Sequence, residues 1–157
     1  MVDIQTVSIA VASASVTVAA IYYVWQIRHQ TKMRQTDLLV RLFSTLDSKD
    51  WLEAWEKVRD RKIMDYETYK KKHGLVEANQ VYVFYDQLGR LLQKGLINID
   101  LLPLETGQII IAWEKLKPLL EGSRKQFSEP KLGSGFEYLY NVVKKREQAG
   151  VKSDEVA

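Results

Sequence analysis

The sequence predicts an all-α protein in which a single N-terminal transmembrane helix continues into a cytoplasmic bundle of about five or six helices. Three observations support this fold class: a long uncharged stretch near the N-terminus, apolar residues at three- and four-residue intervals along the rest of the chain, and an ordinary globular composition. Hydrophobic residues make up 46% of the 157 residues, and charged residues make up 27%. There is no cysteine, which excludes disulfide scaffolds, iron–sulfur clusters and Cys-rich zinc sites.

Residues 1–27 are predicted to form a membrane anchor. From residue 7 to residue 25, 19 consecutive positions lack a charged side chain. A helix of that length covers roughly 28 Å, close to the hydrocarbon thickness of a bilayer. A cleaved signal peptide fits less well, because residues 1–3 carry an acid and no cation, and the small residues 12–14 lie inside the apolar run. A soluble helix buried against partner subunits is the other alternative, since hydroxyl-bearing residues make the stretch only weakly hydrophobic.

The cations that flank the anchor predict its orientation. Residues 1–27 contain no Lys or Arg, whereas four cations follow closely: Arg28, Lys32, Arg34 and Arg41. Because positively charged residues stay on the cytoplasmic side of the cell membrane, we expect the N-terminus outside and residues 28–157 inside. The aromatic residues at positions 22, 23 and 25 would then lie at the inner headgroup level.

Small side chains form a stripe along the anchor. They recur at intervals of four, three and four residues, which places them on one face of a helix: Ser8, Ala12, Ser15 and Ala19. Helices in lipid associate where small side chains let their backbones approach, so this stripe is a candidate helix-packing face. The alternative is that Ala and Ser are merely tolerated in a single span that faces lipid.

Residues 28–47 are predicted to form a juxtamembrane amphipathic helix, with an apolar stripe at positions 38, 39, 42, 43 and 46. A helical cytoplasmic domain follows at residues 48–148. Its first helix begins at a cap formed by Ser48 or Asp50 and carries Trp51, Trp55 and Val58 on one face. We expect residues 36–148 to fold alone, with Trp55 and Trp113 buried.

The later helices of the domain are predicted from periodicity and from helix-ending residues. A short helix around Tyr66 and Tyr69 runs into three lysines and Gly74. A longer helix covers residues 77–94 and ends at Gly95 in a left-handed conformation. Residues 81–85 have strand propensity, but they lie within a longer three-and-four pattern, which favours helix.

The C-terminal part of the domain is predicted to contain a capped turn and two more helices. Asp100 caps the turn, which holds Pro103 near its start. Residues 109–116 form an apolar helix, and Pro118 kinks or restarts it. Residues 122–123 and 128–135 are expected to be loops, since they contain glycine and proline. The last helix begins near Phe136 and ends in the cations at 144–146, and residues 149–157 form a flexible tail.

Several of these segments resemble a known family. They are residues 46–48, 53–59, 95–97 and 113–118, with the sequences LDS, EAWEKVR, GLI and WEKLKP. These segments are similar to a family of small bacterial and archaeal proteins known only as a domain of unknown function. The resemblance implies one N-terminal span and a short helical cytoplasmic domain over nearly the whole chain. It implies no catalytic or binding residues.

The sequence contains no recognisable catalytic chemistry. His29 and His73 are the only histidines, and neither has a second histidine at ligand spacing, so we expect no metal site. Residues 133–135 have the sequence GSG but lack the lysine and the preceding strand of a phosphate-binding loop, and we expect no cofactor. The cations at 70–72 and 144–146 fit helix ends, with contact to anionic lipid as the alternative. A net charge of +3 and the absence of a recognised motif argue against nucleic acid.

These observations favour an interaction protein. The hypothesis is a membrane-anchored helical module or accessory subunit that holds a partner at the inner membrane surface. Its expected partners are the lipid bilayer and either another membrane protein or a second copy of the chain. The alternative is an enzyme with an unrecognised site between helices, for which the polar-tipped aromatic candidates are Tyr82, Tyr85, Trp113 and Tyr140.

Overall fold

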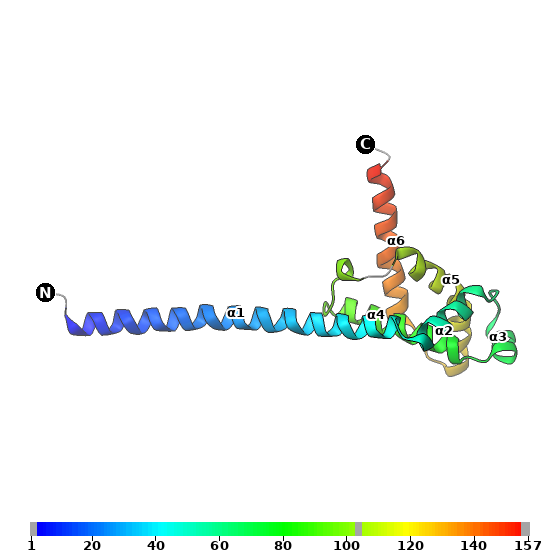
Figure 1. The fold of residues 1–157 in the computed structure, drawn as a ribbon, viewed down its shortest axis with the longest axis horizontal. Helices are drawn as coiled ribbons and strands as arrows, with labels where there is room; N and C mark the ends of the chain where they lie inside the picture. Colours follow the sequence, from blue (N-terminus) through cyan, green and yellow to red (C-terminus); the bar gives the residue numbers. More distant parts are fainter. Residues whose placement is uncertain (1–2, 103–104, 155–157) are drawn as a thin grey trace. The chain divides into compact units, whose positions relative to one another are not determined.

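The computed structural model describes residues 3–102 and 105–154, and it is helical almost throughout (Figure 1). The helices are α1 (Ile4–Leu46), α2 (Lys49–Asp60), α3 (Tyr66–His73), α4 (Val76–Gln93), α5 (Thr106–Phe127) and α6 (Ser134–Asp154), with a short 3₁₀ helix η1 (Ile99–Leu101). No strand occurs in the described ranges, so the all-α prediction is confirmed. The chain divides into two compact units, one ending at Val40 and the other beginning at Arg41.

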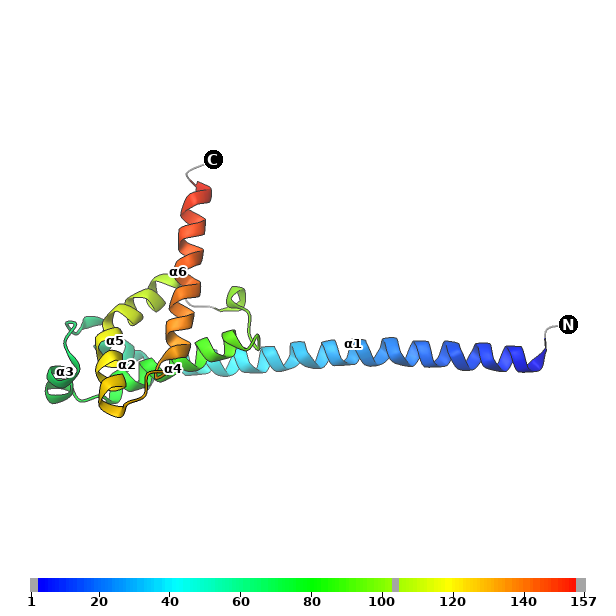
Figure 2. The ribbon, with the colours of Figure 1, turned by 180° about the vertical axis from the view of Figure 1, so that it is seen from behind.

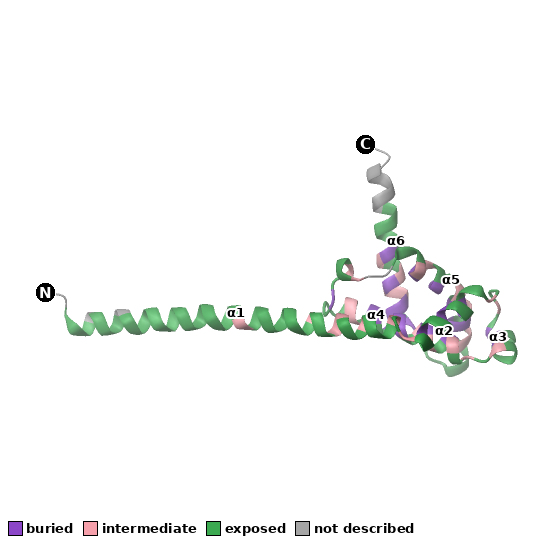
Figure 3. Cartoon of the chain, viewed as in Figure 1, coloured by how far each residue is buried: buried purple, intermediate pink, exposed green. Residues whose placement is uncertain are grey.

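Helix α1 joins most of the predicted anchor, from Ile4 onward, and the predicted juxtamembrane segment as far as Leu46 in one uninterrupted element, and residues 1–2 lie outside the described residues. Its apolar side chains are solvent-exposed along residues 7–24, and Figure 3 shows almost the whole helix as exposed. An amphipathic helix in a soluble domain would instead bury an apolar face. Within the described residues of the first unit, nothing covers the apolar N-terminal part of α1.

The ends of α2 and α3 are set by local capping. The Ser48 hydroxyl accepts a hydrogen bond from the Trp51 N–H at 3.3 Å, so of the two predicted caps Ser48 is confirmed. The Asp65 carboxylate caps α3 in the same way, accepting from the Thr68 N–H at 3.0 Å. Gly74 ends α3 with a φ of +72°, in the region that glycine adopts readily.

Helix α4 confirms that residues 81–85 belong to a helix and not to a strand. Its C-terminus closes with a Schellman motif in which Gly95 has a φ of +67°. The Leu96 N–H donates to the Leu91 carbonyl at 3.0 Å, and the Gly95 N–H donates to the Leu92 carbonyl at the same distance. The predicted left-handed glycine at this helix end is therefore confirmed.

The capped turn after α4 differs from the prediction. Asn98, not Asp100, is the cap of η1, and its side-chain oxygen accepts from the Asp100 N–H at 3.2 Å. The Asp100 carboxylate instead pairs with Arg146 of α6, since it points away from its own turn. Pro103 lies outside the described residues.

Helix α5 is longer than predicted, because it passes through both Pro118 and Gly122 without interruption. The predicted loop at residues 122–123 is therefore wrong. Buried side chains lie on both sides of Pro118, from Trp113 and Leu116 to Leu119 and Leu120, so packing holds the helix together across the missing backbone donor. At Gly122, a Cβ atom would overlap the side chain of Tyr66 from α3. Glycine serves close helix packing there.

Helix α6 also exceeds its predicted bounds. It begins at Ser134 and continues to Asp154, so the cations at 144–146 lie inside the helix and not at its end. Cations favour the last turn of a helix but do not stop one, and residues 147–149 are good helix formers. The predicted tail at 149–157 is helical as far as Asp154, and residues 155–157 lie outside the described residues. The loop predicted before this helix is present over residues 128–133.

The core of the second unit is aromatic and lies between α2, α4, α5 and α6, where Figure 3 shows most of the buried residues. Phe136 stacks on Tyr85 with ring centroids 5.0 Å apart and meets Trp113 edge-on at 5.1 Å. Trp55 is 8% exposed and Trp113 is 6% exposed, which confirms the predicted burial of both tryptophans. Helix α6 crosses α4 near its own N-terminus (Figure 1, Figure 2).

Candidate functional site

The first functional feature is the apolar part of α1. Within the described residues, α1 is the one helix long and apolar enough to cross a membrane, judged by its length and composition. None of its most apolar stretch is buried against the rest of the chain. Exposed apolar surface of this extent marks a contact with lipid or with another protein.

Three of the hydroxyl groups in this stretch are paired within the helix. The Ser13, Ser15 and Thr17 hydroxyls each donate to the backbone carbonyl four residues earlier, at 2.8 to 3.0 Å. A hydroxyl that is already hydrogen-bonded costs much less to place in an apolar medium than one without a partner. The polar residues that make the stretch weakly hydrophobic are thus compatible with a lipid environment.

The predicted small-residue stripe lies on the exposed surface of α1. All four of its members are exposed: Ser8, Ala12, Ser15 and Ala19. Two shallow hollows open along it, one lined in part by Ser8 and Ala12 and the other in part by Ser15 and Ala19. Nothing within the first unit covers the stripe.

Aromatic and basic residues follow the apolar stretch. The Trp25 and His29 rings are nearly parallel, with centroids 5.7 Å apart. The ring centroids of Tyr22 and Trp25 are 6.5 Å apart. The predicted juxtamembrane cations are all exposed: Arg28, Lys32, Arg34 and Arg41. Aromatic rings next to cations are the arrangement found where a helix leaves the hydrocarbon region.

A second feature is an apolar groove of about 310 Å³ between α4 and α5. We call it the α4–α5 groove; it is lined by Tyr66, Leu75, Ala78, Asn79, Tyr82, Val83, Leu116, Leu119, Leu120, Ser123, Phe127 and Leu132. Among the described residues, no Asp, Glu, His, Lys or Arg side chain lines it. Burial raises the pKa of the Tyr82 phenol above its ordinary value. The described lining of the groove thus offers apolar contact and a few neutral polar groups.

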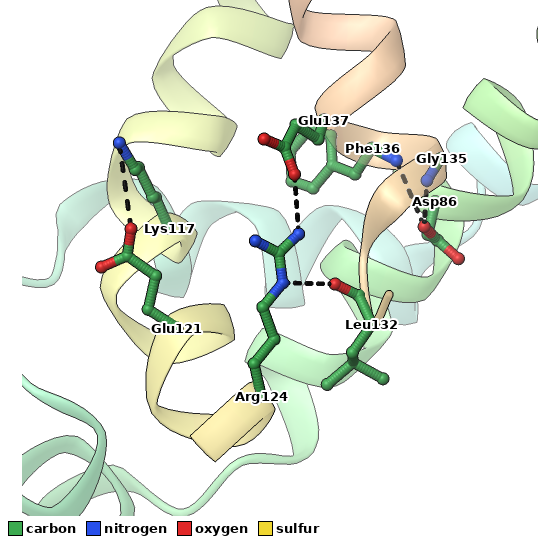
Figure 4. Close-up of polar contacts among 8 residues, drawn as sticks. All are labelled: Asp86, Lys117, Glu121, Arg124, Leu132, Gly135, Phe136 and Glu137. Atoms are coloured by element: carbon green, nitrogen blue, oxygen red, sulfur yellow. Dashed lines mark hydrogen bonds and ion pairs between the residues drawn. The ribbon is translucent and has the colours of Figure 1, made fainter. Parts of the chain in front are cut away.

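The most constrained polar side chain is Asp86, which the sequence did not single out. It is 7% exposed, and its Oδ1 accepts from the backbone N–H groups of Gly135 and Phe136 at 2.9 and 3.2 Å (Figure 4). Its Oδ2 accepts from Arg90 Nε at 2.8 Å. A carboxylate at a helix N-terminus satisfies unpaired N–H groups and favours the positive end of the helix dipole. Asp86 therefore holds the start of α6 against α4.

Two further polar contacts join elements of the domain. Arg124 donates through Nε to the Leu132 carbonyl at 2.8 Å and through a terminal nitrogen to Glu137 at 2.7 Å, which ties α5 to α6 (Figure 4). Glu77 accepts from Lys57 at 3.1 Å and lies 3.5 Å from Arg61. Its own backbone N–H, and then the Lys57 ammonium, lower the pKa of the Glu77 carboxyl. These contacts tie separate elements of the domain together: α5 to α6 and to the loop before it, and α4 to the C-terminal end of α2.

The four aromatic candidates for an enzyme site divide between the α4–α5 groove and the aromatic cluster around Phe136. Tyr82 lines the groove, whereas Tyr85 is fully buried in the core and its hydroxyl has no partner among the described residues. Trp113 stacks on Tyr140 with centroids 5.4 Å apart, and the Tyr140 hydroxyl accepts from Lys144 at 2.8 Å. Tyr85 and Trp113 share the aromatic cluster around Phe136, so they serve packing. The described part of the chain holds no group of three potential metal ligands.

Of the two basic runs, one lies at a helix end as predicted and the other lies inside a helix. Lys70, Lys71 and Lys72 lie in the last turn of α3, as predicted, and the Lys70 ammonium sits 5.5 Å from the centre of the Tyr66 ring. Lys144 to Arg146 lie within α6, where Arg146 pairs with Asp100. Lys70, Lys144 and Arg146 are thus engaged in contacts within the domain.

The fold defines a class of protein: an all-α domain that follows an N-terminal helix long and apolar enough to span a bilayer. Within that class, the chain belongs to the family described as the domain of unknown function DUF4760, whose model matches residues 9–143. The match begins in the apolar part of α1 and ends in α6, so both belong to the family domain. It confirms the resemblance noted in the sequence. No curated protein and no solved structure matches the chain.

Proposed function

We propose that this protein is a membrane-anchored helical interaction module, an accessory subunit that holds a partner at the inner surface of the cell membrane. The observation that carries the proposal is the apolar N-terminal part of α1, which has no charged side chain from residue 7 to residue 25 and no cover from its own chain. Its paired hydroxyls and the aromatic and basic residues that follow support the same assignment.

The family match favours a retained helix over a cleaved signal peptide. The family model begins at residue 9, so it includes most of the apolar stretch. A signal peptide is removed from the mature protein and does not form part of its folded domain. The excess of cations after residue 27 supports an N-terminus outside and a cytoplasmic domain.

An interaction role is favoured over the enzyme alternative by the chemistry of the α4–α5 groove. Among the described residues that line it there is no Asp, Glu, His, Lys or Arg, and its polar groups are those of Tyr, Asn and Ser side chains. A catalytic pocket needs convergent titratable groups, whereas an apolar surface suits contact with another molecule.

Topology and extraction test the anchor. The full chain should stay in the membrane fraction after an alkaline carbonate wash, and a reporter fused at residue 157 should be active only in its cytoplasmic form. Recovery of the chain in the wash, or activity of an external reporter, would contradict the proposal. Charged substitutions within the span, Val11→Asp with Val18→Asp, should release the chain, because each charge at the bilayer centre costs about 2.5–3.5 kcal/mol on insertion scales.

Purification in a mild detergent tests the partner. A native-host preparation should contain the chain in a stoichiometric complex, with either another membrane protein or a second copy. A monomer with nothing bound would leave a plain anchored domain and contradict the role as an interaction module.

A further inference from the structure

Helix α1 is uncovered over a second stretch beyond its apolar part. Between residues 33 and 40 its two sides differ: Leu38 and Leu39 are half-buried, whereas Met33 and Val40 are 59% and 58% exposed. Met33 and Val40 are seven residues apart, so they lie on the same face. An exposed apolar face on a helix that also carries charged residues indicates a surface for contact with another molecule.

A line of uncharged residues along α1 has the spacing of a helix pair, and all of its members except Gln26 are exposed. Starting at Val40 and moving back by alternating four and three residues gives positions 40, 36, 33, 29, 26 and 22, and the same alternation continues to Ala19, Ser15, Ala12 and Ser8. None of these ten positions is charged, although α1 carries Arg28, Lys32, Arg34 and Asp37 within the same range. A seam of this spacing without charge is the contact line of two helices packed side by side.

We propose that two copies of this chain pair in parallel along this line, which we call the α1 seam. The inference rests on the proposed membrane anchoring, because copies inserted with the same orientation can meet only in parallel. It adds to the proposed function the identity of one partner, a second copy, and the residues of the contact. The small-residue stripe is the part of the seam within the span, and Met33 and Val40 are its apolar contacts beyond it.

The charges beside the seam fit a parallel pair. Lys32 and Asp37 flank the seam on opposite sides and are five residues apart. In a parallel pair of helices, flanking residues with this offset face each other across the contact, so Lys32 of one copy approaches Asp37 of the other. Arg28 and Arg34 lie away from the contact line, where two like charges do not meet.

The surface of the seam suits interlocking side chains. The two shallow hollows on α1 lie along it, and Tyr22, at the end of one of them, is 57% exposed. A side chain of the second copy can enter such a hollow, as knobs enter holes between packed helices. The Ser15 hydroxyl is already bonded to the Val11 carbonyl at 2.8 Å, so closure of the pair leaves it satisfied.

Disulfide formation between single cysteines tests the seam, because the chain has no cysteine of its own. Thr36 lies on the seam and Thr31 lies on the opposite side of α1. They are otherwise matched: both are exposed, and each hydroxyl bonds to the carbonyl four residues earlier, at 3.1 and 2.9 Å. We expect full-length Thr36→Cys in membranes to form disulfide-linked dimers at least about tenfold faster than Thr31→Cys, because only seam positions bring two Cα atoms within disulfide range. Equal rates, faster linkage at Thr31→Cys, or no linkage at either would overturn the pairing.

A second pair of variants tests the seam within the span. Ala19→Leu places a bulky side chain on the seam, whereas Ala20→Leu adds the same hydrophobic surface beside it. In the Thr36→Cys background, Ala19→Leu should slow dimer formation and Ala20→Leu should not. The opposite result, or equal rates, would overturn the seam in the span. The carbonate wash separates this inference from the proposed function, since a chain that stays in the membrane without forming dimers contradicts the seam alone.

Discussion

The Asp86 carboxylate is the clearest case of a single residue that organises its surroundings. It accepts hydrogen bonds from two backbone N–H groups at the start of α6 and from the guanidinium of Arg90, and its side chain is buried. A buried charge is stable only when it is paired and hydrogen-bonded, and Asp86 meets both conditions. One side chain of α4 thus determines where α6 begins.

Removing this acceptor should destabilise the domain. Asp86→Ala leaves two N–H groups of α6 without a partner, and we expect a loss of about 2–3 kcal/mol in the free energy of unfolding. Asp86→Asn keeps an acceptor oxygen but loses the charge, and should cost about 1 kcal/mol. Denaturant unfolding in mild detergent, followed by tryptophan fluorescence, measures both. Asp50→Asn, at an exposed position in α2, is the control, and equal costs at the two sites would contradict the role of Asp86.

At the scale of elements, the crossing of α4 and α6 depends on glycine. A Cβ atom at Gly89 would overlap the carbonyl group of Gly135, so the two backbones are in direct contact. This close approach lets Tyr85 and Phe136 stack beside it. Gly122 plays the same part where α5 meets Tyr66 of α3.

Alanine at the crossing should force the helices apart. We expect Gly89→Ala to cost about 3 kcal/mol, at the upper end of overpacking penalties, because the obstruction is backbone and cannot rotate away. Gly107→Ala is the matched control, since that glycine also lies in a helix but a Cβ there meets nothing within 4 Å. It should gain about 0.5–1 kcal/mol from helix propensity. Thermal unfolding of the two variants compares them directly, and a neutral Gly89→Ala would exclude a close crossing.

The contact between α2 and α4 through Glu77 should respond to pH. The pKa of Glu77 is lower in the folded protein than in an unfolded chain, so the carboxylate stabilises the fold above its ordinary pKa of about 4.3. This contribution is lost as the pH falls through the lowered pKa. Glu77→Gln should therefore lower the free energy of unfolding at pH 7. Below a pH of about 4, the free energy of unfolding of this variant should fall less steeply than that of the wild-type protein. Unfolding curves across that range measure the effect. Glu53→Gln, in an exposed ion pair with Lys49, should change the profile little.

At the scale of the whole molecule, the second unit contains its own core and should fold without the first. We expect a fragment of residues 41–157 to be soluble, helical and cooperative in unfolding, because its buried aromatic cluster is complete within it. Trp55→Ala or Trp113→Ala in this fragment should cost about 3–5 kcal/mol, as for other buried aromatic residues. Circular dichroism and denaturant titration test this. An insoluble fragment, or losses below about 1 kcal/mol at both tryptophans, would contradict an independent core.

Local features of the chain were predictable where neighbouring residues decide them. The helical class, the Ser48 cap and the left-handed Gly95 follow from periodicity and from side chains within a few positions of each helix end. The uncharged stretch of α1 can likewise be recognised from the sequence, since only its length and composition are needed. The small-residue stripe could be located by spacing, although its contact stays a prediction.

The tertiary structure decided the features in which distant residues meet. Glycine and proline near residues 118–122 predict a break in one helix, but packing against α3 and the core keeps α5 continuous. Asp86 looks in the sequence like any acid on a helix, and only the approach of α6 makes it a buried cap. The α4–α5 groove combines residues from several elements that no local pattern connects. The sequence by itself determined the helical class and which segment is apolar enough for a membrane, because those properties depend on neighbours along the chain. Helix crossings, buried partners and grooves depend on neighbours in space.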